Sequence, residues 1–315
     1  MNSSTSSSDL KAFTCRIVLY GFLFLSVLVA ACFFLPSKHA RETMLGSQIT
    51  KLKALEALPG ERVVIVGGSG CGQGFVTSNI CAALNRPAYN MGLHAGLGLI
   101  YQMAAVEPLI RRNDIVLLIP EYANFDGSTC FGNAELLMMV TDIIPKHKKL
   151  LTFDHWMHLL PLMPKYGADK LRRAFTKDFK INNVTRYDLY GDAIIPNGLK
   201  SDARLPILAG PKITEGAYSG AIMPYILDFA RRINDRGARL CFVPPALMMS
   251  SYVNGKTFAE KIYKEVERSG VPCVGFPNRY ALADHFFYDT PYHLNLNGRL
   301  LRTKILIEDI AALLN

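Results

Sequence analysis

A serine in a glycine-rich turn could act as a nucleophile in this sequence. Ser69 lies in residues 67–72, GGSGCG, directly after the apolar run 62–66. A serine on a tight turn between a strand and a helix is exposed at the end of the sheet, and its own N–H can stabilise an oxyanion. We therefore expect Ser69 to be a nucleophile, with an N-cap serine in a structural turn as the alternative interpretation.

A histidine and an aspartate stand together near the other end of the chain. Residues 287–295, FYDTPYHLN, contain Asp289 and His293, and Pro291 keeps this segment from forming a helix. A serine hydroxyl needs a neutral imidazole to take its proton, and the imidazole needs a carboxylate to fix its tautomer. The sequence thus predicts Ser69 as nucleophile, His293 as base and Asp289 as the residue that orients His293.

The same glycine turn has part of the spacing of a phosphate-binding loop, but its next residues exclude one. Gly67 and Gly72 fit G-x-x-x-x-G, yet Gln73 and Gly74 follow where a P-loop has Lys and Ser or Thr. A dinucleotide turn, G-x-G-x-x-G, is not completed in either register. We therefore expect no nucleotide cofactor, and the scattered cysteines and histidines indicate no metal site.

The elements that must position these residues follow an α/β pattern, in which apolar strand-like runs alternate with helical segments. The predicted strands are 62–66, 87–91, 114–119, 239–243 and 272–276. The predicted helices are 75–84, 97–111, 222–234, 258–268 and 296–314. We expect a three-layer domain over 61–315, a parallel sheet with helices on both faces. Residues 123–215 fit the pattern poorly and are predicted to be an insertion near the carboxyl edge of the sheet, where ligands bind.

An apolar segment near the N-terminus predicts a single membrane helix. Residues 17–35 form nineteen consecutive positions without a charge, which at about 1.5 Å each nearly span a hydrocarbon core of about 30 Å. Residues 1–16 are then a tail and 36–60 a connector. Residues 29–32, VAAC, also resemble a lipobox, so that cleavage and lipidation at Cys32 is the alternative to an uncleaved anchor.

The charge balance points to an anionic partner. Among 315 residues, Lys and Arg number 35 against 26 Asp and Glu, a net charge of +9, and residues 146–186 hold ten Lys or Arg against three Asp. Large apolar residues are interleaved in this segment, as in interfacial segments of membrane proteins, so we expect it to contact membrane lipid. A membrane partner, an acidic polymer or a solvated basic helix over the core are the alternatives. No nucleic-acid-binding motif is present. Seven cysteines without a C-x-x-C pair predict buried thiols, with a Cys71–Cys81 bridge left open.

At these residues the sequence resembles the SGNH branch of the GDSL-type esterases and acyltransferases, a flavodoxin-like fold. The strand with GGSGCGQGF resembles the first sequence block, residues 89–96 (YNMGLHAG) the second and 289–293 the last. The resemblance implies an oxyanion hole made by the N–H groups of Ser69 and Gly92. Two departures stand out: Asp289 is four residues before His293 rather than three, and the third block is replaced by residues 119–124, IPEYAN. Asn90 is the candidate for the missing side-chain donor.

With one N-terminal membrane helix, the chain is similar to the anchored proteins of alginate O-acetylation and teichoic acid D-alanylation. The resemblance implies an acyltransferase on the outer or periplasmic side of a bacterial inner membrane, held by a single span. It would move acetyl to a cell-surface polysaccharide through an acyl-serine. Its partners would be an integral membrane O-acyltransferase and the polysaccharide acceptor. An esterase or deacetylase of the same substrates, or a non-catalytic accessory protein with this fold, are the alternatives.

Overall fold

The computed structural model describes residues 7–37, 39–127, 129–176, 186–194 and 218–314. A parallel sheet forms its centre, with four strands in the order β2-β1-β3-β4. The strands are β1 (Val63–Gly67), β2 (Ala88–Asn90), β3 (Ile115–Ile119) and β4 (Arg239–Phe242). The predicted runs 62–66, 87–91, 114–119 and 239–243 thus become strands whose boundaries differ from the prediction by at most one residue.

Alternate residues of each strand face opposite layers of helices, which gives the three layers expected from the sequence. On one face, Val64, Val116 and Leu240 pack against helices α5, α9 and α10, and on the other, Ile65 and Leu117 pack against α4 and α11. β1 and β3 are buried throughout, which explains why they read as unbroken apolar runs. The helices around the sheet are α2 (Ser47–Ala57), α3 (Ser69–Gly72), α4 (Thr77–Leu84), α5 (Leu99–Val106), α9 (Met223–Asp235), α10 (Met249–Arg268) and α11 (Leu296–Leu314).

The predicted fifth strand, 272–276, is wrong in the structure. Cys273 forms only an isolated bridge with Phe242. A second, two-stranded parallel sheet lies beside this region instead, formed by β5 (Leu247–Met248) and β6 (Ala281–Leu282). Two-residue strands are too short for a period to show in the sequence, so neither was predicted.

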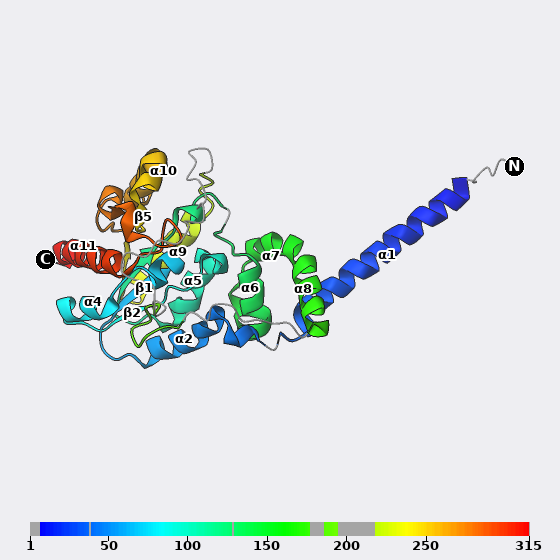
Figure 1. The fold of residues 1–315 in the computed structure, drawn as a ribbon, viewed down its shortest axis with the longest axis horizontal. Coiled ribbons are helices and arrows are strands. Elements are labelled where there is room, and N and C mark those ends of the chain that lie inside the picture. Colours follow the sequence, from blue (N-terminus) through cyan, green and yellow to red (C-terminus); the bar gives the residue numbers. More distant parts are fainter. Residues whose placement is uncertain (1–6, 38, 128, 177–185, 195–217, 315) are drawn as a thin grey trace.

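The described part of the insertion between residues 134 and 175 is mostly helical, and its apolar residues pack with Cys32 of the N-terminal helix and with Leu97 and Tyr101. It contains α6 (Ala134–Met138), the π-helix η6 (Met139–Ile143), the 3-10 helices η7 (Pro145–Leu150) and η8 (Leu160–Leu162), α7 (Phe153–Leu159) and α8 (Met163–Phe175). Figure 1 shows α6, α7 and α8 between the sheet and the N-terminal helix. Residues 186–194 return to the sheet, where Asn90 N–H donates to Tyr190 O over 2.9 Å.

The N-terminal helix α1 (Ser7–Phe34) is long and apolar enough to cross a membrane, over Leu10–Phe34. It begins ten residues before the predicted anchor, so most of the predicted tail is helical. The helix continues through Cys32, whose side chain is buried. The predicted connector 36–60 contains α2, which packs Leu55 into the main core and so belongs to the domain.

The cysteines form no bridge. All seven are free, and Cys71 and Cys81, the pair left open by the sequence, contact different backbone carbonyls instead. Cys71 Sγ lies 3.5 Å from Ile119 O, and Cys81 Sγ lies 3.7 Å from Ala88 O. Burial raises the pKa of the Cys71 thiol to about 12, so at neutral pH it is an uncharged packing residue beside the glycine turn.

Candidate functional site

The Ser69 turn lies at the carboxyl end of β1, where the sequence predicts it. Gly68 is the residue before α3, and Ser69 is the first residue of that one-turn helix. Ser69 is half-buried, whereas the other residues of 67–72 are buried, so the serine is the accessible position of the turn. Gly72 approaches the second sequence block so closely that a Cβ there would lie 2.9 Å from Gly92 O. Gly72 therefore permits close packing of the turn against the backbone of the second block.

The predicted Asp289–His293 pair is formed. His293 Nδ1 lies 2.8 Å from Asp289 Oδ1, and the two side chains are 14% and 28% exposed. A carboxylate on Nδ1 holds the proton there and leaves Nε2 as the basic nitrogen. Asp289 is four residues before His293, one more than in the family that the sequence resembles, and this spacing does not prevent the contact.

The histidine loop packs directly on the serine turn. A Cβ built on Gly70, the residue after Ser69, would lie 3.3 Å from Cβ of Tyr292, the residue before His293. Helix α11 reinforces the contact, because Arg302 Nη1 donates to Gly70 O over 3.2 Å. The fold therefore brings together two segments that are more than 200 residues apart in the chain.

A carboxylate that the sequence did not single out stands next to Ser69. Glu121 follows β3, and its Oε1 accepts a 3.0 Å hydrogen bond from Gly70 N–H and a longer one, 3.4 Å, from Ser69 Oγ. It is only 8% exposed. Glu121 lies in the replaced third block, so its place directly after a buried strand was the available signal. Since it holds an N–H at the serine turn, it occupies the region where an oxyanion would need donors.

Two predicted oxyanion donors are engaged inside the protein. Asn90 is fully buried, and its Nδ2 donates to Cys71 O and to Asp192 Oδ1, both at 2.8 Å. Its Oδ1 accepts from Gly92 N–H over 2.9 Å. Asn90 therefore links the second sequence block, residues 89–96, to the glycine turn of the first block instead of facing a substrate. Of the three predicted oxyanion donors, the Ser69 N–H is the one that these bonds do not use.

Asp192, from the returning end of the insertion, completes this support. Its carboxylate accepts from Asn90 and from both the N–H and the hydroxyl of Thr77, the latter two over 2.6 and 2.7 Å. Burial raises the pKa of Asp192, while these hydrogen bonds lower it. The sequence prediction missed Asp192 because it lies in the segment without recognisable periodicity.

Two buried basic side chains, Lys51 and Arg302, contact the backbone of the second block and of the Ser69 turn. Lys51 Nζ donates to Asn90 O, Gly92 O and Gly191 O over 2.7 to 2.9 Å, and burial lowers its pKa to about 7. Arg302 is also fully buried, with its guanidinium carbon 4.2 Å from the centre of the Phe75 ring. Burial lowers the pKa of Arg302, and nearby groups including Glu121 oppose that shift.

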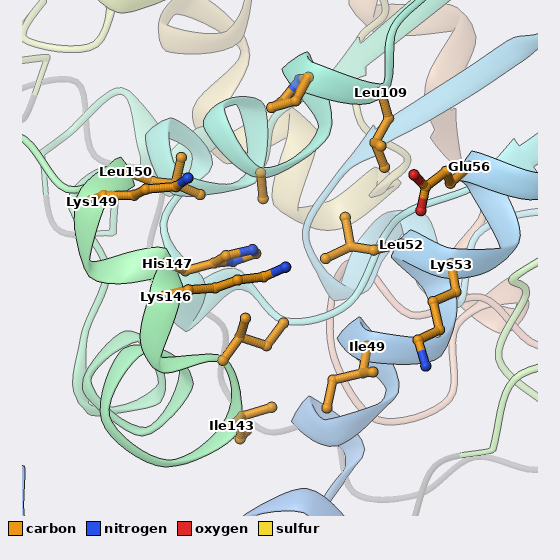
Figure 2. A pocket seen from close by; sticks show the side chains of 13 residues that line it. Ile49, Leu52, Lys53, Glu56, Leu109, Ile143, Lys146, His147, Lys149 and Leu150 are labelled. Atoms are coloured by element: carbon orange, nitrogen blue, oxygen red, sulfur yellow. The ribbon is translucent and has the colours of Figure 1, made fainter.

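A separate cleft of about 460 Å³ lies between α2, the end of α5 and η7. Figure 2 shows Lys146 and His147 extending from η7 toward Leu52 of α2. His147 Nδ1 lies 2.7 Å from Tyr101 Oη, and burial lowers the pKa of His147 to about 4, so this histidine is neutral at neutral pH. None of the residues that line this cleft belongs to the Ser69 site.

Comparison with known proteins assigns no family to this arrangement. No protein-family model matches the chain, and no curated protein matches it. The function must therefore be inferred from the Ser69 site itself.

Proposed function

We propose that this chain is a membrane-anchored SGNH-like O-acyltransferase that uses Ser69 to pass an acyl group, acetyl in our proposal, to a polysaccharide hydroxyl. The observation that carries the proposal is the Asp289–His293 pair on a loop whose Tyr292 packs against Gly70 of the Ser69 turn. The strand order 2-1-3-4 supports it, because flavodoxin-like sheets begin with that order and bind ligands at the carboxyl ends of their strands.

The proposed chemistry has two half-reactions. His293 Nε2 takes the Ser69 hydroxyl proton as Oγ attacks the acyl carbonyl of the donor, and the protonated His293 then gives that proton to the leaving group. In the second half-reaction His293 deprotonates the acceptor hydroxyl, which attacks the acyl-serine and restores the Ser69 hydroxyl. Asp289 orients His293 and stabilises its charged form, and the Ser69 N–H donates to the oxyanion.

The donor and acceptor lie outside the membrane in this proposal. An integral membrane O-acyltransferase would supply the acyl group, and the domain would face the periplasm or the outside of a bacterial inner membrane, anchored by α1. The length and apolar composition of α1 support such an anchor. The same residues acting on water instead of a glycan hydroxyl would make the protein an esterase or deacetylase.

Glu121 favours one further candidate, a non-catalytic accessory protein. A carboxylate that accepts from Gly70 N–H opposes a negative charge at the same place, so catalysis requires Glu121 to move or to be neutralised. An accessory protein would keep the fold to bind a glycan or membrane enzyme without needing that change.

A serine-reactive fluorophosphonate separates these possibilities. The full chain in detergent is treated, and intact mass is compared with Ser69→Ala, His293→Ala and the control Ser250→Ala, an exposed serine at the start of α10. Transferase and esterase both predict one adduct that Ser69→Ala abolishes, His293→Ala strongly reduces and Ser250→Ala leaves unchanged. No adduct on the folded protein would favour the accessory function.

An acetyl ester donor then distinguishes transfer from hydrolysis. With the donor and increasing polysaccharide, a transferase releases less acetate and yields acetylated glycan. An esterase releases acetate at the same rate with and without the glycan. Both activities should disappear in Ser69→Ala.

A further inference from the structure

The base of the apolar helix is docked on the domain rather than joined by a free tether. Gly167 of α8 lies against the backbone of Leu28, where any side chain on the glycine would collide with the Leu28 carbonyl. One turn further along, Lys170 Nζ donates to Cys32 O over 2.9 Å and to Asp142 Oδ1 over 2.8 Å. Lys170 was predicted within the lipid-contacting basic segment, but it is 4% exposed and acts as a buried clamp.

The exposed part of α1 has the length of a bilayer core. Residues 10–27 are all exposed, and at about 1.5 Å each they extend about 27 Å, close to a core of about 30 Å. The two charged residues of this stretch, Lys11 and Arg16, lie in its first two turns, where long basic side chains can reach the headgroups. Burial begins at Leu28. The edge of the hydrocarbon therefore falls where α8 meets α1.

The position of the hydrocarbon edge along α1 also indicates where the neighbouring helix α7 lies relative to the membrane. Because Gly167 meets Leu28 and Lys170 meets Cys32, α8 runs away from the membrane as its numbers rise, and its first residues lie nearest the bilayer. Those residues follow η8 and α7 directly. Figure 1 shows α7 and α8 beside the base of α1.

An apolar stripe runs along this part of the structure. Phe153, Met157 and Leu160 are spaced by four and three residues, so they share one helix face, and they are 75%, 52% and 52% exposed. Lysines flank this stretch in the chain: Lys149 before it and Lys165 after it are exposed, and Lys148 lies over the Phe33 ring at 5.2 Å. Exposed apolar residues bordered by lysines are the composition of a segment at an anionic membrane surface.

We propose that the α7–η8 face, formed by Phe153 and Met157 of α7 and Leu160 of η8, inserts into the interface of the bilayer that α1 spans, with anionic lipid headgroups against the lysines that flank it in the chain. Together with the Lys170 clamp, this contact holds the domain in one orientation and fixes the position of Ser69 relative to the membrane. The proposal is independent of the reaction at Ser69, because none of its residues belongs to the Ser69 site.

Tryptophan quenching tests it on the full chain. Trp156 is the one tryptophan, so Trp156→Phe supplies a background without this fluorophore. A single Trp is then introduced as Phe153→Trp, Met157→Trp or Leu160→Trp, with Val253→Trp in α10 as the matched control, since Val253 is apolar and 66% exposed. Each variant is reconstituted in vesicles of phosphatidylcholine and phosphatidylglycerol, with and without bromine on the acyl chains.

The expected result is at least a twofold loss of fluorescence with brominated lipid at all three positions of the α7–η8 face and none at Val253. Iodide in the aqueous phase should instead quench Val253→Trp more than the three face variants. Equal iodide quenching at the face positions and Val253, with no effect of bromine, would overturn the proposal and leave the face for a protein partner. The three positions are independent, so one variant that misfolds by circular dichroism leaves two to decide. Fluorophosphonate labelling of Ser69, measured in parallel, reports the proposed function separately.

Discussion

At the scale of single residues, the site combines a formed Asp289–His293 pair with a serine beside a buried carboxylate. The Ser69 hydroxyl lies 3.4 Å from Glu121 Oε1, and the neighbouring Gly70 N–H donates to the same oxygen. Hydrogen bonds of catalytic groups in proteins without substrate are often long and tighten only in the reactive complex. Glu121 is therefore the residue whose change should reveal the most about Ser69.

We predict that Glu121→Gln raises the rate of Ser69 labelling by fluorophosphonate about tenfold, which corresponds to about 1.4 kcal/mol. The amide keeps the size of the side chain but removes the negative charge that opposes an oxyanion beside Gly70 N–H. The rate constant of adduct formation, followed by intact mass, is the measurement.

Glu107→Gln is the control, because Glu107 pairs with Arg232 near the surface and is remote from the turn in sequence and structure. It should leave the labelling rate unchanged. Slower labelling in Glu121→Gln than in the native chain would instead show that the carboxylate assists Ser69, as a base or by positioning it.

At the scale of elements, a single lysine joins α2 to the end of β2 and to the returning insertion. Lys51 donates to three backbone carbonyls on these segments, at Asn90, Gly92 and Gly191. Lys53, two residues away on the same helix, is exposed. The position of the second sequence block, residues 89–96, therefore depends on α2, a helix in the segment that was predicted to be a connector.

Lys51 should make stability depend on pH in a specific window. Burial lowers its pKa from 10.5 to about 7, so between these values the unfolded chain holds a proton that the folded chain has released. The free energy of unfolding contributed by Lys51 consequently rises with pH from about 7 and is flat below that. Lys51→Met removes this rise and, by leaving three carbonyls unpaired, costs about 2 kcal/mol at neutral pH.

Denaturant unfolding of the full chain in detergent, at about pH 6, 7.5 and 9, measures both effects. The gap between the native chain and Lys51→Met should widen only above about pH 7. Lys53→Met should follow the native chain at every pH. A constant gap would mean that Lys51 keeps its ordinary pKa despite its burial.

At the scale of the whole molecule, the apolar helix and the domain share one packed core. Cys32 belongs to the same apolar cluster as Leu136, Leu159 and Met163 of the insertion. Tyr166 Oη adds a 2.7 Å hydrogen bond to Asp142, the carboxylate that also receives Lys170. Removing α1 would expose this cluster and leave the Lys170 clamp incomplete.

Gly167→Leu is predicted to separate α1 from α8 and to lower the free energy of unfolding by about 2 to 3 kcal/mol, because an added side chain meets the Leu28 backbone. Ala168→Leu, at the next and exposed position, should change it by less than about 0.5 kcal/mol. Denaturant unfolding in detergent gives both values. Equal effects of the two substitutions would show that the helices do not meet at Gly167.

The sequence alone determined the features that depend on local patterns. Unbroken apolar runs such as residues 115–119 can be satisfied only in a strand buried on both faces, and alternation with helices then requires parallel pairing. The pattern also placed Ser69 at the end of β1 and predicted the contact of Asp289 with His293, since residues four apart in a short loop lie within reach of each other.

Only the tertiary structure decided what each polar group contacts. Glu121, Asp192 and Lys51 lie on three separate elements, and no spacing in the chain shows that all three meet the turns around Ser69 and Gly92. For the same reason Asn90 was predicted to face a substrate, whereas its amide is engaged within the protein. Lys170 appeared to be a surface charge because burial depends on what packs over a residue, and here that is the end of α1.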